Sequence, residues 1–248
     1  MATNSLHFAN PPITEAIVAI VVSDLPDSAV EQIRKLVQRA LPRYPKATDI
    51  SETQFVGEIR PQGLPKASAQ QKFLGLQFQS EDSKQIFQAR LNGFSFHRLA
   101  PYDRWETFRA EAFRLWELFR ETVGDVKPLA FSVRYINALV VPAPALLEDF
   151  LKLYPEIPKE WPQNLSNYVM RLDLPISDQT SDAGHLTAVQ TLLPSQPGTS
   201  SILLDLNVQY PALRNSNETL WQRIDAVRPV KNRLFNASLT PAMKARIS

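Results

Sequence analysis

The sequence KQIFQARLNGFSFHRLAPYDRWETFRAEAFRLWELFRETV, residues 84–123, carries the clearest secondary-structure pattern in the chain. In its first part Phe87, Ala89 and Leu91 alternate with polar side chains, a period of two that is typical of a half-buried strand. Gly93 interrupts the alternation and predicts a β-bulge within this strand. In its second part, residues 105–123, apolar side chains recur three and four positions apart, which predicts an amphipathic helix. Such a helix must bury its aromatic stripe on a sheet.

The residues before this stretch predict a strand, a helix and two more strands. Residues 13–23 contain an almost continuous apolar run, and residues 28–41 show helical spacing before two prolines end the helix. Residues 54–60 and 72–79 are predicted strands, joined by the turn-rich sequence PQGLPKAS. The first half therefore has the order strand, helix, three strands, long helix.

The same order returns after residue 124. The predicted elements are a strand at 127–141, a short helix at 146–153, strands at 168–176, 185–193 and 202–210, and a helix at 215–227. Pro229 predicts a kink or an end to this last helix. The pattern predicts an α+β fold, in which units 1–124 and 125–248 are pseudo-repeated β-α-β-β-β-α motifs within one compact domain. Together they would form a large curved antiparallel sheet backed by long helices, a saddle or helix-grip arrangement.

Composition excludes several classes of function. The 248 residues include no cysteine, which excludes disulfides and thiolate catalysis, and a net charge of +2 does not by itself indicate a polyanionic partner. The three histidines are isolated from one another, so no metal site is predicted. Neither a G-x-S-x-G motif nor a glycine-rich phosphate loop is present, so we expect no catalytic residues and no cofactor. The absence of a long apolar run or signal-peptide pattern favours a cytoplasmic protein without membrane contact.

The C-terminal residues 219–248 are locally basic. Six lysines and arginines in this segment face only one acidic residue, Asp225. The simplest interpretation is a solvated helix face followed by a frayed tail.

Polar residues on strongly patterned strands are the best candidates for a ligand or partner face. A charge within a strand must face water or be paired, so these residues would line one open face of the sheet. An ordinary wet sheet face with cross-strand ion pairs to Glu58 and Asp173 is the competing interpretation. The candidates are Arg60, Arg90, Asn92, His97, Arg98, Arg134, Tyr135, Asn137 and Arg171.

Several short motifs, in this order, span nearly the whole chain: FANPPI with Glu15 and Ala16, GFSF followed by Tyr102 and Trp105, RYIN at 134–137, and LF with SLT at 234–240. In these motifs the chain resembles a sporadically distributed bacterial family of uncharacterised proteins. The resemblance implies no catalytic residues. Its patchy distribution implies an association with mobile or defence genes.

Three functions remain open from the sequence. The first is a non-enzymatic cytoplasmic binding or regulatory protein of a bacterial defence or toxin–antitoxin locus, acting through a protein partner or as a homo-oligomer. The second is a nucleic-acid-binding saddle that uses Arg60, Arg90, Arg98, Arg134 and the basic C-terminal segment. The third is a small-molecule-binding protein or hydrolase, with a pocket between sheet and helices that uses His97 with Arg98 or Arg134.

Overall fold

The computed structural model describes residues 8, 10–58, 66–124, 126–143, 146–163, 165–177, 183–194, 196–211 and 219–248. The strands are β1 (Ile13–Val22), β2 (Lys46–Glu58), β3 (Lys66–Gln79), β4 (Gln85–Arg90), β5 (Gly93–Leu99), β6 (Pro128–Pro142), β7 (Val169–Ser177), β8 (Ala183–Leu193) and β9 (Thr199–Pro211). The helices are α1 (Ala29–Ala40), α2 (Trp105–Val123), η1 (Leu147–Asp149, a 3₁₀ turn), α3 (Leu220–Ser238) and α4 (Pro241–Ile247).

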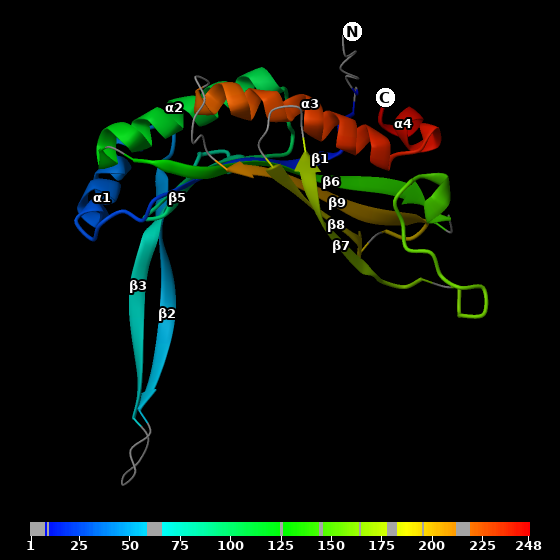
Figure 1. Cartoon of the computed structure of the whole chain (residues 1–248), viewed down its shortest axis with the longest axis horizontal. Coiled ribbons are helices and arrows are strands. Elements are labelled where there is room, and N and C mark those ends of the chain that lie inside the picture. The colour runs from blue at the N-terminus through cyan, green and yellow to red at the C-terminus, as the bar shows by residue number, and fades with distance from the viewer. Residues whose placement is uncertain are drawn as a thin grey trace. The chain divides into compact units, whose positions relative to one another are not determined.

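These elements confirm the predicted α+β class and the large antiparallel sheet. Within the described residues the sheet has nine strands in the order β2-β3-β4-β5-β1-β6-β9-β8-β7 (Figure 1). The chain divides into two compact units. Unit 1 consists of Met1–Val18, Arg98–Arg104 and Ala130–Ser248, and unit 2 consists of Ala19–His97 and Trp105–Leu129.

The core of unit 2 is aromatic. Phe87 on β4 stacks on Phe78 of β3 with ring centroids 4.3 Å apart, and Phe94 on β5 meets Trp116 of α2 at 5.7 Å. The helix predicted at 105–123 is confirmed, and its apolar stripe is buried as expected. Burial of these rings contributes about 1.5–3 kcal/mol per side chain, so packing rather than helix propensity holds α2 in place.

The strand predicted at 84–98 is in fact two strands. β4 ends at Arg90, Leu91 and Asn92 form a turn, and β5 begins at Gly93, so the predicted bulge is wrong. Gly93 is required for another reason: a Cβ atom there would lie 2.7 Å from the backbone oxygen of Ile20 on β1. Among the described residues, four strands therefore follow α1 before α2, not the three that the sequence predicts.

Strands β2 and β3 are longer than predicted and form an extended antiparallel ribbon (Figure 1). The prediction began at residues 54 and 72, whereas the strands begin at Lys46 and Lys66. The added segments are rich in Ala, Ser, Thr and Gln and carry little apolar alternation, so a pattern search does not detect them. Along 48–53 the side chains are exposed or half-buried, because this part of the ribbon stands away from the core.

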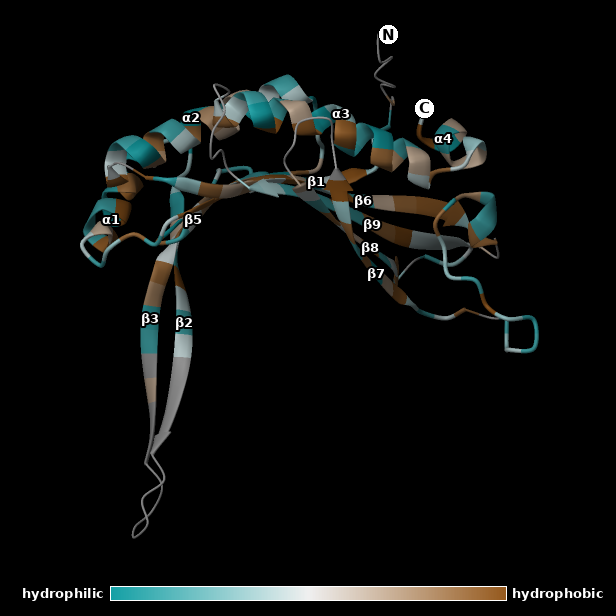
Figure 2. Ribbon diagram, viewed as in Figure 1, coloured by the Kyte–Doolittle hydropathy of each residue, from teal (hydrophilic) through white to brown (hydrophobic). Residues whose placement is uncertain are grey.

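In unit 1 the helix α3 covers one face of β6 and β9. Along β6 the buried side chains alternate with half-buried or exposed ones, and β9 alternates in the same way except at Asp205, which is also buried. Figure 2 shows hydrophobic residues along both strands. Arg223 and Lys231 of α3 lie over the rings of Phe131 and Tyr135, which identifies the odd-numbered face of β6 as the covered one. Even-numbered residues of β6 point to the other face.

Three predictions at the end of the chain need correction. The short helix predicted at 146–153 is only the 3₁₀ turn η1. The helix predicted at 215–227 spans Leu220–Ser238 and passes through Pro229, because buried residues continue on its inner face beyond the proline. The predicted frayed tail is wrong: α4 follows α3, and its Met243 and Ile247 are buried.

Candidate functional site: the polar face of β6, β9, β8 and β7

A row of polar side chains crosses four adjacent strands of unit 1 on the face opposite α3. The strand registers pair Arg134 on β6 with Asn207 on β9, Asn207 with Thr187 on β8, and Thr187 with Asp173 on β7. Directly paired residues of neighbouring strands share one face of a sheet. The adjacent rows add five side chains to this surface, which we call the polar face: Ser132, Arg171, His185, Asp205 and Gln209.

The inner end of the polar face is an arginine–aspartate pair. Arg134 Nε donates to Asp205 Oδ1 at 2.8 Å and Arg134 Nη2 donates to Asp205 Oδ2 at 2.5 Å, a bidentate geometry. The Asp205 side chain is only 9% exposed and the Arg134 side chain 42% exposed, so the guanidinium covers the carboxylate. The hydrogen bonds to Asp205, followed by the charges of Asp205 and Glu15, outweigh partial burial and raise the pKa of Arg134.

The outer end of the polar face centres on Asp173. Arg171 Nε donates to one carboxylate oxygen at 2.7 Å, Thr187 Oγ1 donates to the other at 2.8 Å, and His185 Nε2 lies 3.3 Å away. These contacts, that from Arg171 first, hold the pKa of Asp173 well below its usual range. The carboxylate is therefore ionised throughout the physiological range and serves as a hydrogen-bond acceptor.

Between these two ends lies an unused acceptor. Asn207 Oδ1 is buried and has no hydrogen-bond donor within the part of the chain that the structure describes. A buried polar atom without a partner costs about 1–3 kcal/mol.

The arginines and aspartates of the polar face balance one another. Two positive side chains, Arg134 and Arg171, are held by Asp205 and Asp173, and the charge of Glu15, outside the polar face, also acts on Arg134. The arrangement can recognise a partner by hydrogen bonds, but its arginines are not free to bind phosphate.

The structure separates the nine residues that the sequence groups on one face. Arg134 and Arg171 lie on the polar face of unit 1. Tyr135 and Asn137 lie on the opposite face, which α3 covers, and both are 2% exposed. They differ from Arg134 because successive residues of a strand point to opposite faces of the sheet. The side-chain amide of Asn137 donates hydrogen bonds to the backbone carbonyls of Tyr135 and Leu204, at 3.3 and 3.0 Å.

The remaining predicted residues belong to other surroundings. His97 on β5 is hydrogen-bonded to Ser95 at 2.9 Å, whereas Arg98 points to the opposite face of the same strand. Arg90 ends β4 and Asn92 is an exposed turn residue whose carbonyl accepts from Val22. Arg60 lies outside the described residues.

Sequence reasoning missed several members of the polar face. Asp205 and Asn207 interrupt the apolar run ILLDLNV of β9, and their period of two places both on the face opposite Leu204 and Leu206. That signal was available. The pairing of β8 with β9, which brings Thr187 and His185 beside them, depends on strand order and has no local signal.

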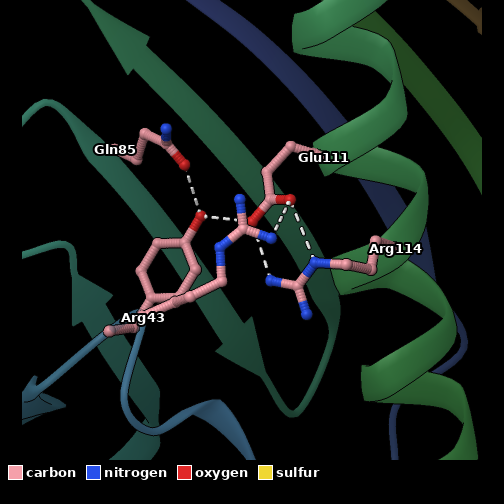
Figure 3. Close-up of polar contacts among 5 residues, drawn as sticks. Arg43, Gln85, Glu111 and Arg114 are labelled. Atoms are coloured by element: carbon pink, nitrogen blue, oxygen red, sulfur yellow. Dashed lines mark hydrogen bonds and ion pairs between the residues drawn. The ribbon is translucent and has the colours of Figure 1, made fainter.

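A second polar cluster lies in unit 2 and has a structural role. Figure 3 shows Gln85, Arg43, Glu111 and Arg114 converging, with the carboxylate of Glu111 at the centre. Arg114 donates two hydrogen bonds to Glu111, at 2.9 and 2.7 Å, the Tyr44 hydroxyl lies 2.8 Å away, and Arg43 adds an ion pair at 3.2 Å. With these contacts the carboxylate is saturated with donors and is not placed to act as a base.

The pKa values in this cluster follow from the same contacts. Burial by itself raises the pKa of Glu111, but hydrogen bonds from Arg114 and Tyr44 and the charges of Arg114 and Arg43 outweigh it, so the pKa is lowered. Burial first, and then the charge of Glu111, raise the pKa of Tyr44 far above its usual range. The cluster joins the segment after α1 to β4 and α2.

The described residues contain no group of three or more histidines, aspartates and glutamates that could hold a metal ion. No helix in the described ranges is both long and apolar enough to cross a bilayer. Comparison of the chain with protein-family models, with curated proteins and with solved structures finds no match in any of the three.

Proposed function

We propose that the protein is a non-enzymatic binding or regulatory protein, and that a protein partner docks on the polar face. The observation that carries this proposal is the row of hydrogen-bonding side chains across β6, β9, β8 and β7, which ends at the exposed carboxylate of Asp173. The two aspartate carboxylates, together with the charge of Glu15 that acts on Arg134, favour a partner segment that presents lysine, arginine or amide donors. Polar surfaces of this kind are common in non-obligate protein interfaces.

The experiment is an affinity capture with the full chain and a charge-reversal variant. Asp173→Arg is suited to the test because the residue is exposed, so the fold should tolerate the change. Lys35→Glu on the exposed side of α1, in unit 2, is the matched control. We expect wild type and Lys35→Glu to capture the same partner. The amount captured by Asp173→Arg should be about tenfold lower, which corresponds to a loss of about 1.4 kcal/mol in binding free energy. Equal capture by all three proteins would rule out the polar face.

A second copy of the chain is the simplest partner to test. Light scattering on the purified protein measures the mass in solution directly. A dimer that Asp173→Arg converts to monomer identifies the partner as another copy, and an unchanged dimer excludes the polar face from that contact.

Nucleic acid is the competing partner, and the charge distribution favours it less. Arg134 is neutralised by Asp205, and two residues of the basic C-terminal segment, Arg223 and Lys231, lie on the buried face of α3. Phosphate binding needs exposed, unpaired cations and produces a steep dependence on salt. A gel shift that appears at low salt and weakens steeply with added salt would replace the protein-partner proposal.

The residues expected to form a small-molecule site, His97 and Arg134, do not form one. His97 is engaged with Ser95 and Arg134 with Asp205, so neither is poised for chemistry between sheet and helices. The cationic side chains that do lie between β6 and α3 include Arg223 over Phe131 and Lys231 over Tyr135.

We also propose that residues 1–124 and 125–248 are structural repeats within one curved sheet, as in a saddle. Support comes from the element order: β1, α1, strands and α2 in the first part, and β6, η1, strands and α3 in the second. A crystal structure in which β1–β5 and β6–β9 fail to superpose would contradict the repeat.

The family resemblance supports a cytoplasmic bacterial protein of a defence or toxin–antitoxin locus. The genes beside its own test this assignment, and neighbours with only metabolic functions would argue against it.

A further inference from the structure

The lysine Lys231 lies where a charged side chain is rarely tolerated. It shares the inner face of α3 with Val227 and Phe235, four residues away on each side, and is only 9% exposed. Its Nζ atom lies 3.7 Å from the centroid of the Tyr135 ring on β6, and Tyr135 itself is 2% exposed. The amine therefore sits in the interface between α3 and β6, against an aromatic surface.

No carboxylate compensates this amine. Within the described ranges Lys231 has no hydrogen bond and no ion pair, and the charged group that acts on it is Arg228, one helical turn earlier and of the same sign. The other titratable groups at the site are the hydroxyls of Tyr135 and Tyr102, which lie 3.0 Å apart. An aromatic ring face offers an ammonium up to about 2 kcal/mol, less than the several kcal/mol that its burial costs.

The consequence is an amine that is partly neutral near pH 7. Burial first, and then the charge of Arg228, lower the pKa of Lys231 to about 7. Half of the amines are then unprotonated at pH 7, compared with roughly one in 2,500 for a lysine with an ordinary pKa of about 10.4. Desolvation and a neighbouring cation are the two devices that turn lysines into nucleophiles in enzymes.

We propose that Lys231 is a covalent binding site for small, uncharged carbonyl compounds, which its amine captures as an imine against the ring of Tyr135. The nitrogen lone pair attacks the carbonyl carbon, and the carbonyl oxygen takes up a proton to give a carbinolamine. Loss of one water molecule then forms the C=N bond. The step needs no oxidant, reductant or further reactant, and water reverses it.

The tyrosine pair gives the site a polar edge. Tyr102 is half-buried, and its hydroxyl lies 3.0 Å from that of the buried Tyr135. The two hydroxyls supply O–H groups next to the aromatic surface on which the amine lies. The ring selects a flat or apolar substituent, and the small exposed fraction of Lys231 restricts the compound to a few carbon atoms.

Reductive trapping tests the proposal without assuming the natural ligand. The folded wild-type chain is treated at pH 7 with limiting propanal and cyanoborohydride, which converts an imine into a stable propylamine, and modified lysines are located by peptide mass spectrometry. We expect Lys231 to be modified at least about tenfold faster than the exposed Lys152 of the same unit. Modification of Lys231 no faster than that of Lys152 would overturn the proposal.

Two variants separate reactivity from structure. Lys231→Met keeps the length and the aromatic contact but removes the amine, so fast incorporation should fall to background, whereas Lys152→Met should retain it. Circular dichroism checks that both variants are folded. If Lys231→Met folds and still incorporates label at the wild-type rate, the reactive amine is elsewhere and the proposal fails; if it does not fold, the wild-type rate ratio decides alone.

Discussion

Replacing Glu111 by glutamine should destabilise unit 2 measurably. The Glu111 side chain is 11% exposed, and the substitution removes the charge that Arg114 and Arg43 contact at 2.7–3.2 Å. A hydrogen bond to a charged group contributes about 1.5–3 kcal/mol net. Since Arg114 is 41% exposed and can regain water, we expect a loss of about 2 kcal/mol from the free energy of unfolding.

The Tyr44 hydroxyl limits how far the loss can go. It lies 2.7 Å from Gln85 Oε1 and 2.8 Å from a Glu111 oxygen, and its one proton can serve one acceptor at a time. In the Glu111→Gln variant it retains an acceptor, so no buried hydroxyl is left without a partner. Glu111→Ala removes this contact as well and should cost more.

Thermal and urea unfolding measure the effect. For a chain of this size about 2 kcal/mol corresponds to a decrease in Tm of about 4–8 °C. The matched control is Glu117→Gln on the same helix, because Glu117 forms an exposed pair with Arg120 at 3.2 Å and should contribute less than about 0.5 kcal/mol. A Glu111→Gln variant no less stable than the Glu117→Gln control would refute the reasoning.

The pH dependence provides an independent check of the same carboxylate. The pKa of Glu111 is lower in the folded state than in the unfolded chain, where a glutamate has a pKa of about 4.3. Its stabilisation is therefore complete above about pH 4.3 and is lost as the pH falls through the folded-state pKa. The difference in Tm between wild type and Glu111→Gln should shrink in that acidic window, and a difference that stays constant down to pH 2 would contradict the assignment.

Three further substitutions test other contacts. Asp205→Asn breaks the bidentate pair with Arg134 and should cost about 1–3 kcal/mol in urea unfolding; an unchanged midpoint would mean that the pair is energetically neutral. Gly93→Ala brings a Cβ to 2.7 Å from the Ile20 oxygen and should lower Tm by several degrees, whereas unaltered stability would show that β5 and β1 can separate there. Pro229→Ala restores a helical N–H in α3 and should raise Tm, because proline in a helix interior costs about 3 kcal/mol; a lower Tm would show that the proline is required.

The sequence predicts those features of the fold that depend on the pattern of neighbouring residues. The α2 helix and the α+β class follow from periodicity, which is a property of neighbouring residues. The polar residues of the β2–β3 ribbon carry no such period. Arg134 and Tyr135 were grouped because both are polar, although adjacent strand residues point to opposite faces. The same rule, applied to Asp205, would have placed it on the polar face.

The contacts that make the candidate sites were beyond sequence reasoning. Asp205 meets Arg134 because β9 pairs with β6, across 71 residues of chain, and Lys231 meets Tyr135 because α3 returns over that strand. Both depend on strand order and helix placement, which are set by the whole core. Lys231 looked like one more member of a basic segment, and only its burial distinguishes it.

The division of the chain has a consequence for synthesis on the ribosome. Residues up to Val18 belong to unit 1, most of the following residues up to Leu129 belong to unit 2, and the rest of unit 1 begins at Ala130. Unit 2 is complete when its last residues emerge, but the Thr14 hydroxyl must wait for the carbonyl of Ile136, and the Asn10 N–H for that of Ile247. The part of β1 that belongs to unit 1 is thus synthesised long before β6, its neighbour in the sheet, and keeps an exposed strand edge until β6 has emerged.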